Sequence, residues 1–485
     1  MKSNEVDCWI QEPGIQVLDQ FVRIMGPKAI DLFAGAGGLS LGFGFAGIEV
    51  VGAVEHDENA VKSYNYNIGN HAFEKDITKF TPQMMLKEMK KQNLIRRKSE
   101  IEIICGGPPC PGFSLMGRSK ISSLIKSGEW EGSDARHKFI DDKRNKLFLE
   151  FVKYVEFFKP KVFVMENVKG MESFESEEGA PIIDIIVDEF KSIGYENIQV
   201  KILDSSEYFV PQKRKRIIFI GSASKKKIVH PVAYDSNLTL QDAFIDLPEI
   251  DILTGISAIQ KLKPMSKISG EKRKSLLRYF RTQKVLQHEI IHGSNSSLHK
   301  TRKVNPRDRG IFPLLRSGQE GPRILYKDVY PAMLKQVKKG LPEGYKMLPK
   351  SKGYLIVSLD KKKKRKWKWY DREKFGDKMR RMRWDEPGPT VVAHLEKDGY
   401  MFVHPGEDRT ISVREAARMQ SFPDSFDFSA GGEVAFTRQN RQIGNAVPPL
   451  LGLAIGQMVM HYLGNEPKMT LEATFGVKPR VLIGE

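Results

Sequence analysis

The residue with the clearest chemical potential is Cys110, which lies in the segment GGPPCPGFS. Prolines on both sides fix the backbone φ angle and stiffen the loop, so the thiol would be displayed rigidly. A cysteine attacks as the thiolate, which requires a cation or a general base nearby. Cys105 and Cys8 are the other cysteines of the chain, and the ordinary role of a small hydrophobic residue suits both.

Two further segments carry groups that a cysteine nucleophile needs. Glu166 follows the apolar run Val162–Met165 and is predicted at a strand end. In PQKRKRIIFIG, Gln212, Arg214 and Arg216 alternate before an apolar strand, which would place both arginines on one face. They would supply a positive field for a carboxylate or an anionic substrate. The alternative for Glu166 is a solvated carboxylate at a strand end. The alternative for the charged run with Arg214 and Arg216 is a solvated edge of the sheet.

A glycine-rich turn in DLFAGAGGLSLGF is predicted to receive a ligand. Gly35, Gly37 and Gly38 lie between an apolar strand and a helix, where a missing Cβ permits a tight turn and close approach to the backbone. The spacing departs from the dinucleotide pattern G-x-G-x-x-G, and the Lys-Ser/Thr of a P-loop is missing. Glu55 ends the next strand and Asp76 follows, and such carboxylates suit a ribose diol and an adenine amine. A structural turn with two solvated acids is the alternative.

The elements around these residues indicate an α/β fold. Short, β-branched runs at Ile101–Cys105, Val162–Met165 and Ile217–Gly221 alternate with stretches of helical length, which is typical of a doubly wound, mostly parallel sheet. From residue 222 to about 388 the chain is polar and Lys-rich without this alternation, so a second, smaller and irregular domain is predicted there. Helices are expected from Ser412, in VREAARMQ, and over Leu450–Tyr462.

The composition of the chain indicates which classes of ligand and which cellular environment suit the protein. The chain has 485 residues, enough for two or three domains, and its 78 Lys and Arg against 60 Asp and Glu give a net charge of +18, which suggests a polyanion such as nucleic acid. Three cysteines are too few for a disulfide framework, and no metal site is expected. The longest apolar stretch, Leu450 to Leu463, is too short to span a membrane. We expect a soluble, cytoplasmic protein.

In chain order, the segments DLFAGAGGLSLGF, GGPPCPGFS, ENV, QKRKR, ISVREAARMQSFPDSF and RQIGNAVPP resemble the motif series of the DNA (cytosine-5) methyltransferase family, prokaryotic restriction-modification type. The resemblance covers residues 30–222 and 380–456. It implies a Rossmann-like, S-adenosylmethionine-dependent methyltransferase domain at 28–222 plus 440–485. A target recognition domain would occupy 223–403, and a connection between the two would occupy 404–439.

The resemblance also implies the reaction, in which a methyl group passes from S-adenosylmethionine to C5 of a cytosine flipped out of double-stranded DNA. Cys110 would attack C6, Glu166 would meet N3 and the exocyclic amine, and Arg214 and Arg216 would anchor Glu166 and the substrate. A lid is expected over residues 113–141. The implied substrate contacts are Gln212, Thr390, Ser114 and Arg118. The implied cofactor contacts are Phe33, Ala34, Gly35, Gly38, Leu39, Glu55, His56, Asp76, Ile77, Pro108 and Asn445.

These expectations describe a monomer that binds double-stranded DNA, has no membrane partner, and has a restriction endonuclease only as a genetic partner. A tRNA cytosine-5 methyltransferase is one alternative, and the large basic region 225–380 argues against it. A catalytically inactive DNA-binding homologue is the other, and the presence of Cys110, Glu166, Arg214 and Arg216 argues against it. The run KKKKRKWKWY, Lys361 to Tyr370, is expected to contact phosphates, with a solvated hairpin turn as the alternative.

Overall fold

A computed structural model describes residues 26–109, 147–175, 179–254, 262–281, 299–315, 345–350, 353–359, 366–368, 379–395 and 399–480. Its largest element is a seven-stranded sheet with strand order β3-β2-β1-β4-β5-β7-β6. The strands are β1 (Lys28–Leu32), β2 (Glu49–Glu55), β3 (Ala72–Glu74), β4 (Ile101–Gly106), β5 (Val162–Val168), β6 (Asn197–Asp204) and β7 (Lys215–Ser222). Neighbours from β3 to β5 are parallel, whereas β7 is antiparallel to both β5 and β6. The predicted α/β fold with a mostly parallel sheet is confirmed.

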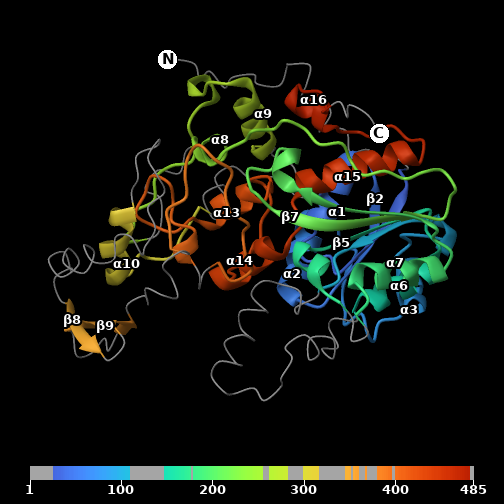
Figure 1. Cartoon of the computed structure of the whole chain (residues 1–485), viewed down its shortest axis with the longest axis horizontal. Helices are drawn as coiled ribbons and strands as arrows, with labels where there is room; N and C mark the ends of the chain where they lie inside the picture. Colours follow the sequence, from blue (N-terminus) through green and yellow to red (C-terminus); the bar gives the residue numbers. More distant parts are fainter. Residues whose placement is uncertain are drawn as a thin grey trace, which may run out of the picture.

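Helices cover both faces of this sheet, with α1 and α15 on one side and α3, α6 and α7 on the other (Figure 1). Successive side chains of a strand point to opposite faces. In β4, Ile103 and Cys105 therefore join the hydrophobic cluster of α1 and α15, while Ile104 joins the cluster on the opposite face. The covering helices are α1 (Gly38–Ala46), α2 (Glu58–Asn67), α3 (Pro82–Lys91), α6 (Leu147–Phe158), α7 (Ile182–Ser192) and α15 (Pro449–Tyr462).

The strand predicted at Val162–Met165 continues to Val168 as β5. Its parallel pairing with β4 ends at Met165, but its antiparallel pairing with β7 runs on to Val168, which is opposite Arg216. Because this second partner satisfies the backbone beyond Met165, Glu166 lies inside the strand near its end, opposite Ile218.

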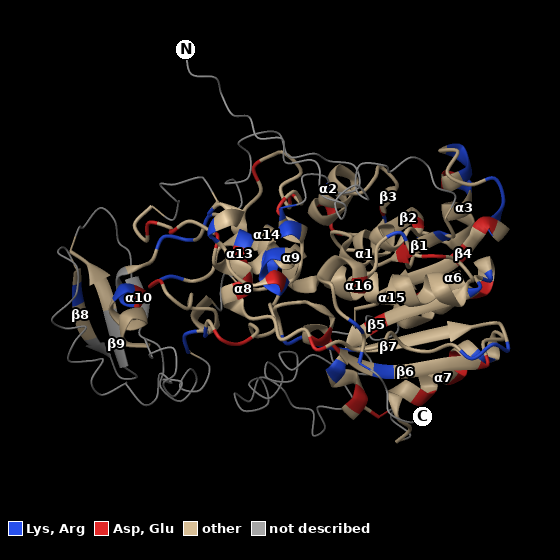
Figure 2. Cartoon of the chain, turned by 90° about the horizontal axis from the view of Figure 1, so that it is seen from above, with Lys and Arg blue, Asp and Glu red and all other residues tan. Residues whose placement is uncertain are grey.

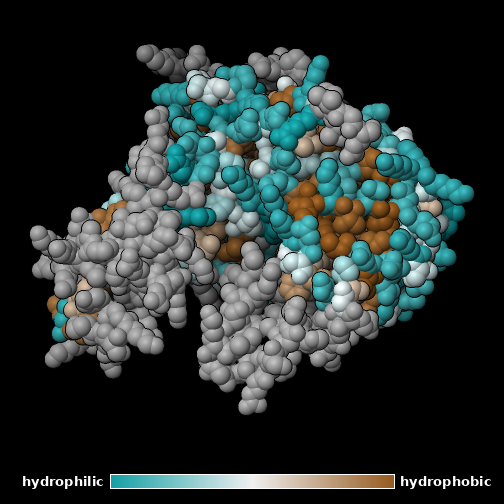
Figure 3. Space-filling view, viewed as in Figure 1, coloured by the Kyte–Doolittle hydropathy of each residue, from teal (hydrophilic) through white to brown (hydrophobic). Residues whose placement is uncertain are grey.

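The edge of the sheet at β6 is only partly covered. Figure 3 shows apolar side chains gathered on the face where β6 and α7 lie, surrounded by hydrophilic residues. In these elements Ile185, Ile198 and Val200 are partly buried against the cluster beneath them. Helix α7 therefore shields the apolar side of the edge strand in part.

Between β7 and α13 the described chain forms elements of ten residues or fewer, and an antiparallel sheet of three strands lies near α10 at the far end of the molecule (Figure 1). Described residues within 228–247 and 265–280 contribute to the same hydrophobic cluster as α1 and α15, whereas Val304, Phe312 and Ile356 form part of a separate small cluster. The domain boundaries stay a prediction, and this packing places residues of those two stretches with the large sheet. The elements are α8 (Leu240–Phe244), α9 (Glu271–Phe280), α10 (Pro306–Ile311), β8 (Tyr345–Lys350), β9 (Gly353–Ser358), β10 (Lys366–Lys368), α13 (Val413–Met419), α14 (Phe436–Asn445) and α16 (Leu471–Phe475).

The helices predicted at VREAARMQ and at residues 450–462 are present as α13 and α15. A capping box begins α13, because the Ser412 side chain accepts a hydrogen bond from Glu415 N while the Glu415 carboxylate accepts one from Ser412 N. Of the basic run 361–370, the described part is β10, which pairs with β9. Residues 366–368 therefore have an extended backbone, and the contact of this run with phosphates stays a prediction.

Candidate active site

The glycine-rich turn joins β1 to α1 and has a strained backbone. Phe33 adopts a φ of 59°, in the left-handed region that non-glycine residues rarely occupy. Gly35 has a φ of 56°, and no heavy atom lies within 4 Å of the position a Cβ would take there. Ala34 N donates to Val54 O at 3.1 Å, which fixes the turn against β2. The turn is therefore fixed by β2 on one side and has open space at Gly35, where a ligand could bind.

Gly38 serves a different purpose. A Cβ at this position would lie 2.1 Å from the carbonyl oxygen of Val447, just beyond the end of α14. Gly38 thus lets the turn pack directly against the segment that follows Asn445, which is exposed at the last position of α14. Leu39, the next residue, is buried in the core of α1 and α15.

Glu55, at the end of β2, faces this turn. Its Oε2 accepts from Gly35 N at 2.9 Å, and its Oε1 accepts from the backbone of His56 and Asp57 at 2.8 and 2.9 Å. Burial raises the pKa of Glu55, but hydrogen bonds from His56, Asp57 and Gly35 outweigh it, so the pKa lies below its usual value. A carboxylate oxygen has about two lone-pair positions, so Oε2, which accepts from Gly35 N, has capacity for one ribose hydroxyl.

Asp76 lies beyond β3, the parallel neighbour of β2, and therefore at the same edge of the sheet. Its Oδ1 accepts from the hydroxyl and the N–H of Thr78, at 2.7 and 3.0 Å, and these bonds lower its pKa. Ile77 is buried beside it. The open turn and these two acids fit the nucleoside part of S-adenosylmethionine, with Glu55 suited to the ribose and Asp76 to the adenine.

The chain that leads to Cys110 is fixed against Glu166. The buried Asn167 donates from Nδ2 to the carbonyl oxygen of Pro108 at 3.0 Å. A Cβ on Gly107 would lie 3.0 Å from Oε2 of Glu166, so a larger residue would require this carboxylate to move by a few tenths of an ångström. The described part of the loop ends at residue 109. Four predicted features lie outside the described residues: Cys110, Ser114, Arg118 and the lid over residues 113–141.

Arg216 is the partner of Glu166. Its Nε lies 2.7 Å from Glu166 Oε1, and the two side chains are only 13% and 14% exposed. Both residues lie in neighbouring strands, β7 and β5, so the pair is supported by the ladder between them. The structure thus brings together a carboxylate, a guanidinium group and the loop that carries Cys110.

Arg214 has other partners. Its guanidinium donates to the carbonyl oxygens of Val391 and Gly444, both at 3.0 Å. Burial lowers the pKa of Arg214 well below its usual value, and the neighbouring charge of Arg216 adds to this effect. The sequence-based prediction is that Arg214 anchors the Glu166 carboxylate. These two bonds go instead to main-chain oxygens of residues that are distant in sequence. A direct role for Arg214 in catalysis stays a prediction.

Gln212 and Thr390 meet at the same junction. The fully buried Gln212 accepts from Val391 N at 2.6 Å and donates to Met419 O at 3.0 Å. Thr390 donates from its hydroxyl to Lys213 O at 2.7 Å. Both predicted substrate residues therefore join the start of β7 to the chain returning from the central region, and a contact with DNA stays a prediction for each.

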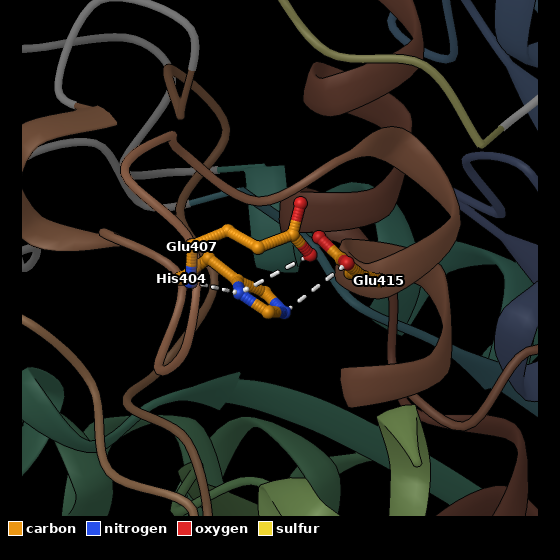
Figure 4. A group of neighbouring side chains, drawn as sticks. All are labelled: His404, Glu407 and Glu415. Atoms are coloured by element: carbon orange, nitrogen blue, oxygen red, sulfur yellow. Dashed lines mark hydrogen bonds and ion pairs between the residues drawn. The ribbon is translucent and has the colours of Figure 1, made fainter. Parts of the chain in front are cut away.

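His404, Glu407 and Glu415 form a cluster with the donor set of a metal site, since their ligand atoms lie within 4.8 Å of one another (Figure 4). However, Arg409 lies 2.7 Å from both carboxylates. Burial lowers the pKa of His404 to about 4, so the imidazole is neutral at pH 7. Because the Arg409 guanidinium already bridges both acids, we assign this cluster to the support of α13. The Ser-x-x-Glu spacing of its capping box is the sequence signal that points to Glu415.

The family model for C-5 cytosine-specific DNA methylases matches residues 27–461. The chain belongs to this family. The resemblance predicted from the sequence is confirmed, and the protein is a DNA (cytosine-5-)-methyltransferase.

Relatives of this methyltransferase align over nearly its whole length. It is 31% identical over 458 residues to the type II methyltransferase M.AgeI of Thalassovita gelatinovora, with 89% of this chain and 99% of that protein covered. It is also 31% identical over 451 residues to the type II methyltransferase M.DdeI of Desulfomicrobium norvegicum, with 90% and 89% covered. The similarity therefore extends across the central region as well as the sheet, and it supports the restriction-modification type.

A solved structure shares the fold of this methyltransferase. It is described as a DNA modification methyltransferase encoded within a prophage of E. coli, with a TM-score of 0.53, 23% identity, and coverage of 90% of this chain and 99% of that one.

The run Phe436–Tyr462 is long and apolar enough to cross a membrane, but 94% of its most apolar window is buried inside the protein. It is accordingly a core segment of the fold.

Proposed function

We propose that this methyltransferase methylates C5 of a cytosine flipped out of double-stranded DNA, through a covalent bond between Cys110 and C6. The observation that carries the proposal is the Glu166–Arg216 pair, which lies directly beside the loop leading to Cys110. A flipped base is required because C6 cannot be reached by a side chain inside a stacked duplex.

The residues around the turn would hold the cofactor. Gly35 offers open space, and Oε2 of Glu55 retains one lone pair for a ribose hydroxyl. S-adenosylmethionine, when bound there, supplies an activated methyl group. Phe33, His56, Pro108 and the other predicted contacts belong to the same proposal.

Cys110 and Glu166 would divide the work on the base. The thiolate of Cys110 adds to C6, and the electron pair of the C5–C6 bond becomes available at C5 for the methyl group. Glu166 meets N3 and the exocyclic amine, and relieves the negative charge that builds on the ring by sharing a proton. Arg216 holds the Glu166 carboxylate in place. After the transfer a base, for which water is the candidate, removes the C5 proton, and Cys110 leaves.

In its biological setting this activity would protect host DNA in a restriction-modification system. The type II methyltransferases that align along the chain support this setting. The enzyme would work in the cytoplasm as a monomer, with a restriction endonuclease as a genetic partner only.

Two measurements test the proposal together. Bisulfite sequencing of DNA from a host expressing the chain should show methylated cytosines in one sequence context. DNA containing 5-fluorocytosine in that context should form a covalent adduct with the wild type and not with Cys110→Ser, which should still bind DNA. Activity retained by Cys110→Ser would contradict the covalent mechanism, and methylation found in tRNA alone would contradict the DNA substrate.

A further inference from the structure

A pocket of about 110 Å³ lies where the start of β7 meets the chain returning from the central region. We call it the junction pocket. Three cationic side chains line it, those of Lys213, Arg380 and Arg383, together with one acidic residue, Glu386. Figure 2 shows Lys and Arg on several of the segments that connect α13 with α10. The cations come from two stretches more than 160 residues apart, so the fold brings them together.

One wall of the pocket comes from the segment RRMR at residues 380–383. Arg381 and Met382 are buried, at 4% and 5% exposure, whereas Arg380 and Arg383 are half-buried and line the pocket. Arg381 donates to the carbonyl oxygens of His404, Glu407 and Phe312 at 2.6 to 2.7 Å, so it holds the backbone between the two other arginines. The positions of Arg380 and Arg383 are thus fixed by a buried neighbour.

The opposite wall is Lys213, between the buried Gln212 and Arg214. Its N–H donates to Gly388 O at 2.8 Å, and Gly388 N donates to Pro211 O at 3.0 Å, which ties its backbone to the other wall. Its side chain is exposed, and within the described part of the chain its ammonium group makes no hydrogen bond or ion pair. Lys213 is therefore a rigidly based cation that points to solvent at the pocket.

The acidic residues leave an excess of positive charge. Arg383 is held by Asp385 through two hydrogen bonds of 2.9 and 2.6 Å. Against Lys213, Arg380 and Arg383 stand Asp385 and Glu386, so one positive charge is in excess. A pocket with cationic side chains on both walls and a net positive charge is suited to a tetrahedral oxyanion.

We propose that the junction pocket binds one phosphate of the DNA backbone, close to the flipped cytosine. Lys213 is three residues before Arg216, which is roughly 10 Å along an extended chain. A phosphate bound there would thus lie within one or two nucleotides of the base held by Glu166 and Arg216. This inference rests on the proposed function, because it takes DNA as the ligand.

The test removes the cations and single phosphates in turn. Lys213→Ala, Arg380→Ala and the double variant are compared with Lys87→Ala and Arg96→Ala, which remove exposed cations near α3. Duplexes contain the recognised sequence with one methylphosphonate at each position near the target cytosine. Binding is titrated at several salt concentrations.

We expect one methylphosphonate position that weakens binding by the wild type and both controls about tenfold, and that does not weaken binding by the double variant. The slope of log affinity against log salt should fall by about 0.9 in the double variant, the value for one phosphate. An unchanged slope, or a loss equal at every methylphosphonate position, would overturn the proposal. A fall near twice that size would also overturn it, because the two cations would then bind separate phosphates.

Wild-type methylation of the unmodified duplex is measured in the same series. One outcome is that the wild type methylates DNA while every methylphosphonate position weakens binding equally in the wild type and in the double variant. In that case the junction pocket is excluded as a phosphate site, and the proposed function stands. If the wild type methylates no DNA, the proposed function fails.

Discussion

The Nε of Arg216 lies 2.7 Å from Oε1 of Glu166, across the antiparallel pair of β7 and β5. The other carboxylate oxygen, Oε2, faces Gly107 on the loop that leads to Cys110. Each oxygen of Glu166 is thus associated with a different element, and the carboxylate connects the strand of Arg216 to the nucleophile loop.

Glu166→Gln should lower turnover by about 100-fold or more, because an amide can hydrogen-bond to the base but shares protons poorly. Single-turnover methylation at saturating cofactor measures the effect. The control is Glu172→Gln, which alters an exposed glutamate shortly after β5. Equal rates for wild type and Glu166→Gln would limit Glu166 to the role of a structural partner of Arg216.

Gly107→Ala should lower the rate of methylation by roughly 10- to 100-fold, since its methyl group would push against Oε2 of Glu166 and a small misplacement of a catalytic group is costly. Cofactor affinity, measured by calorimetry, should stay near that of the wild type. A variant with full activity would show that the loop and Glu166 can separate without consequence.

Asp31, which is buried, should make stability depend on pH. Burial raises its pKa from 3.8 to about 7, although a hydrogen bond from Ser40 lowers it in part. Between about pH 4 and 7 the folded protein keeps a proton that the unfolded chain has lost, so the free energy of unfolding falls as pH rises through this window. Asp31→Asn should flatten this fall relative to the exposed control Asp188→Asn. Thermal unfolding from pH 5 to 8 measures it, and an identical slope in both variants would contradict the assignment.

Glu415→Gln should destabilise the protein by about 1.5–3 kcal/mol, because it weakens the charge-assisted hydrogen bonds that the buried Arg409 donates to Glu415, while Glu407 remains as a charged partner. Urea unfolding gives the change. The control Glu433→Gln alters an exposed acid and should have little effect. A midpoint equal to that of the control would mean that the cluster in Figure 4 contributes little to the fold.

The choice of DNA sequence should reside between residues 222 and 389. This region lies outside the methyl-transfer motifs and carries side chains able to reach base edges. Grafting it onto a related catalytic domain should transfer the recognised site, which bisulfite sequencing reads directly. A folded, active hybrid that keeps the recipient's site would assign specificity elsewhere.

Sequence patterns predicted those structural elements whose formation depends on residues close together in the chain. The glycine-rich turn, the apolar strands and the helix capped by Ser412 and Glu415 all follow from neighbouring residues, and all are present. The partners of Arg214 could not be predicted, because Val391 and Gly444 are brought to it by the fold. The extension of β5 to Val168 has the same reason, since its antiparallel partner β7 comes later in the chain. The packing of residues within 228–247 and 265–280 against the cluster of α1 and α15 could not be predicted, because this polar region lacks a clear hydrophobic period.

Gln212 and Arg214 hold the returning chain through main-chain atoms, namely Val391 N, Val391 O and Gly444 O. Main-chain atoms are the same whichever side chains accompany them. A gene that acquired a foreign insert between residues 222 and 389 would still present the main-chain atoms of Val391 and Gly444 to Gln212 and Arg214. New DNA preferences could therefore arise by recombination of a single piece, without compensating changes in the body of the enzyme.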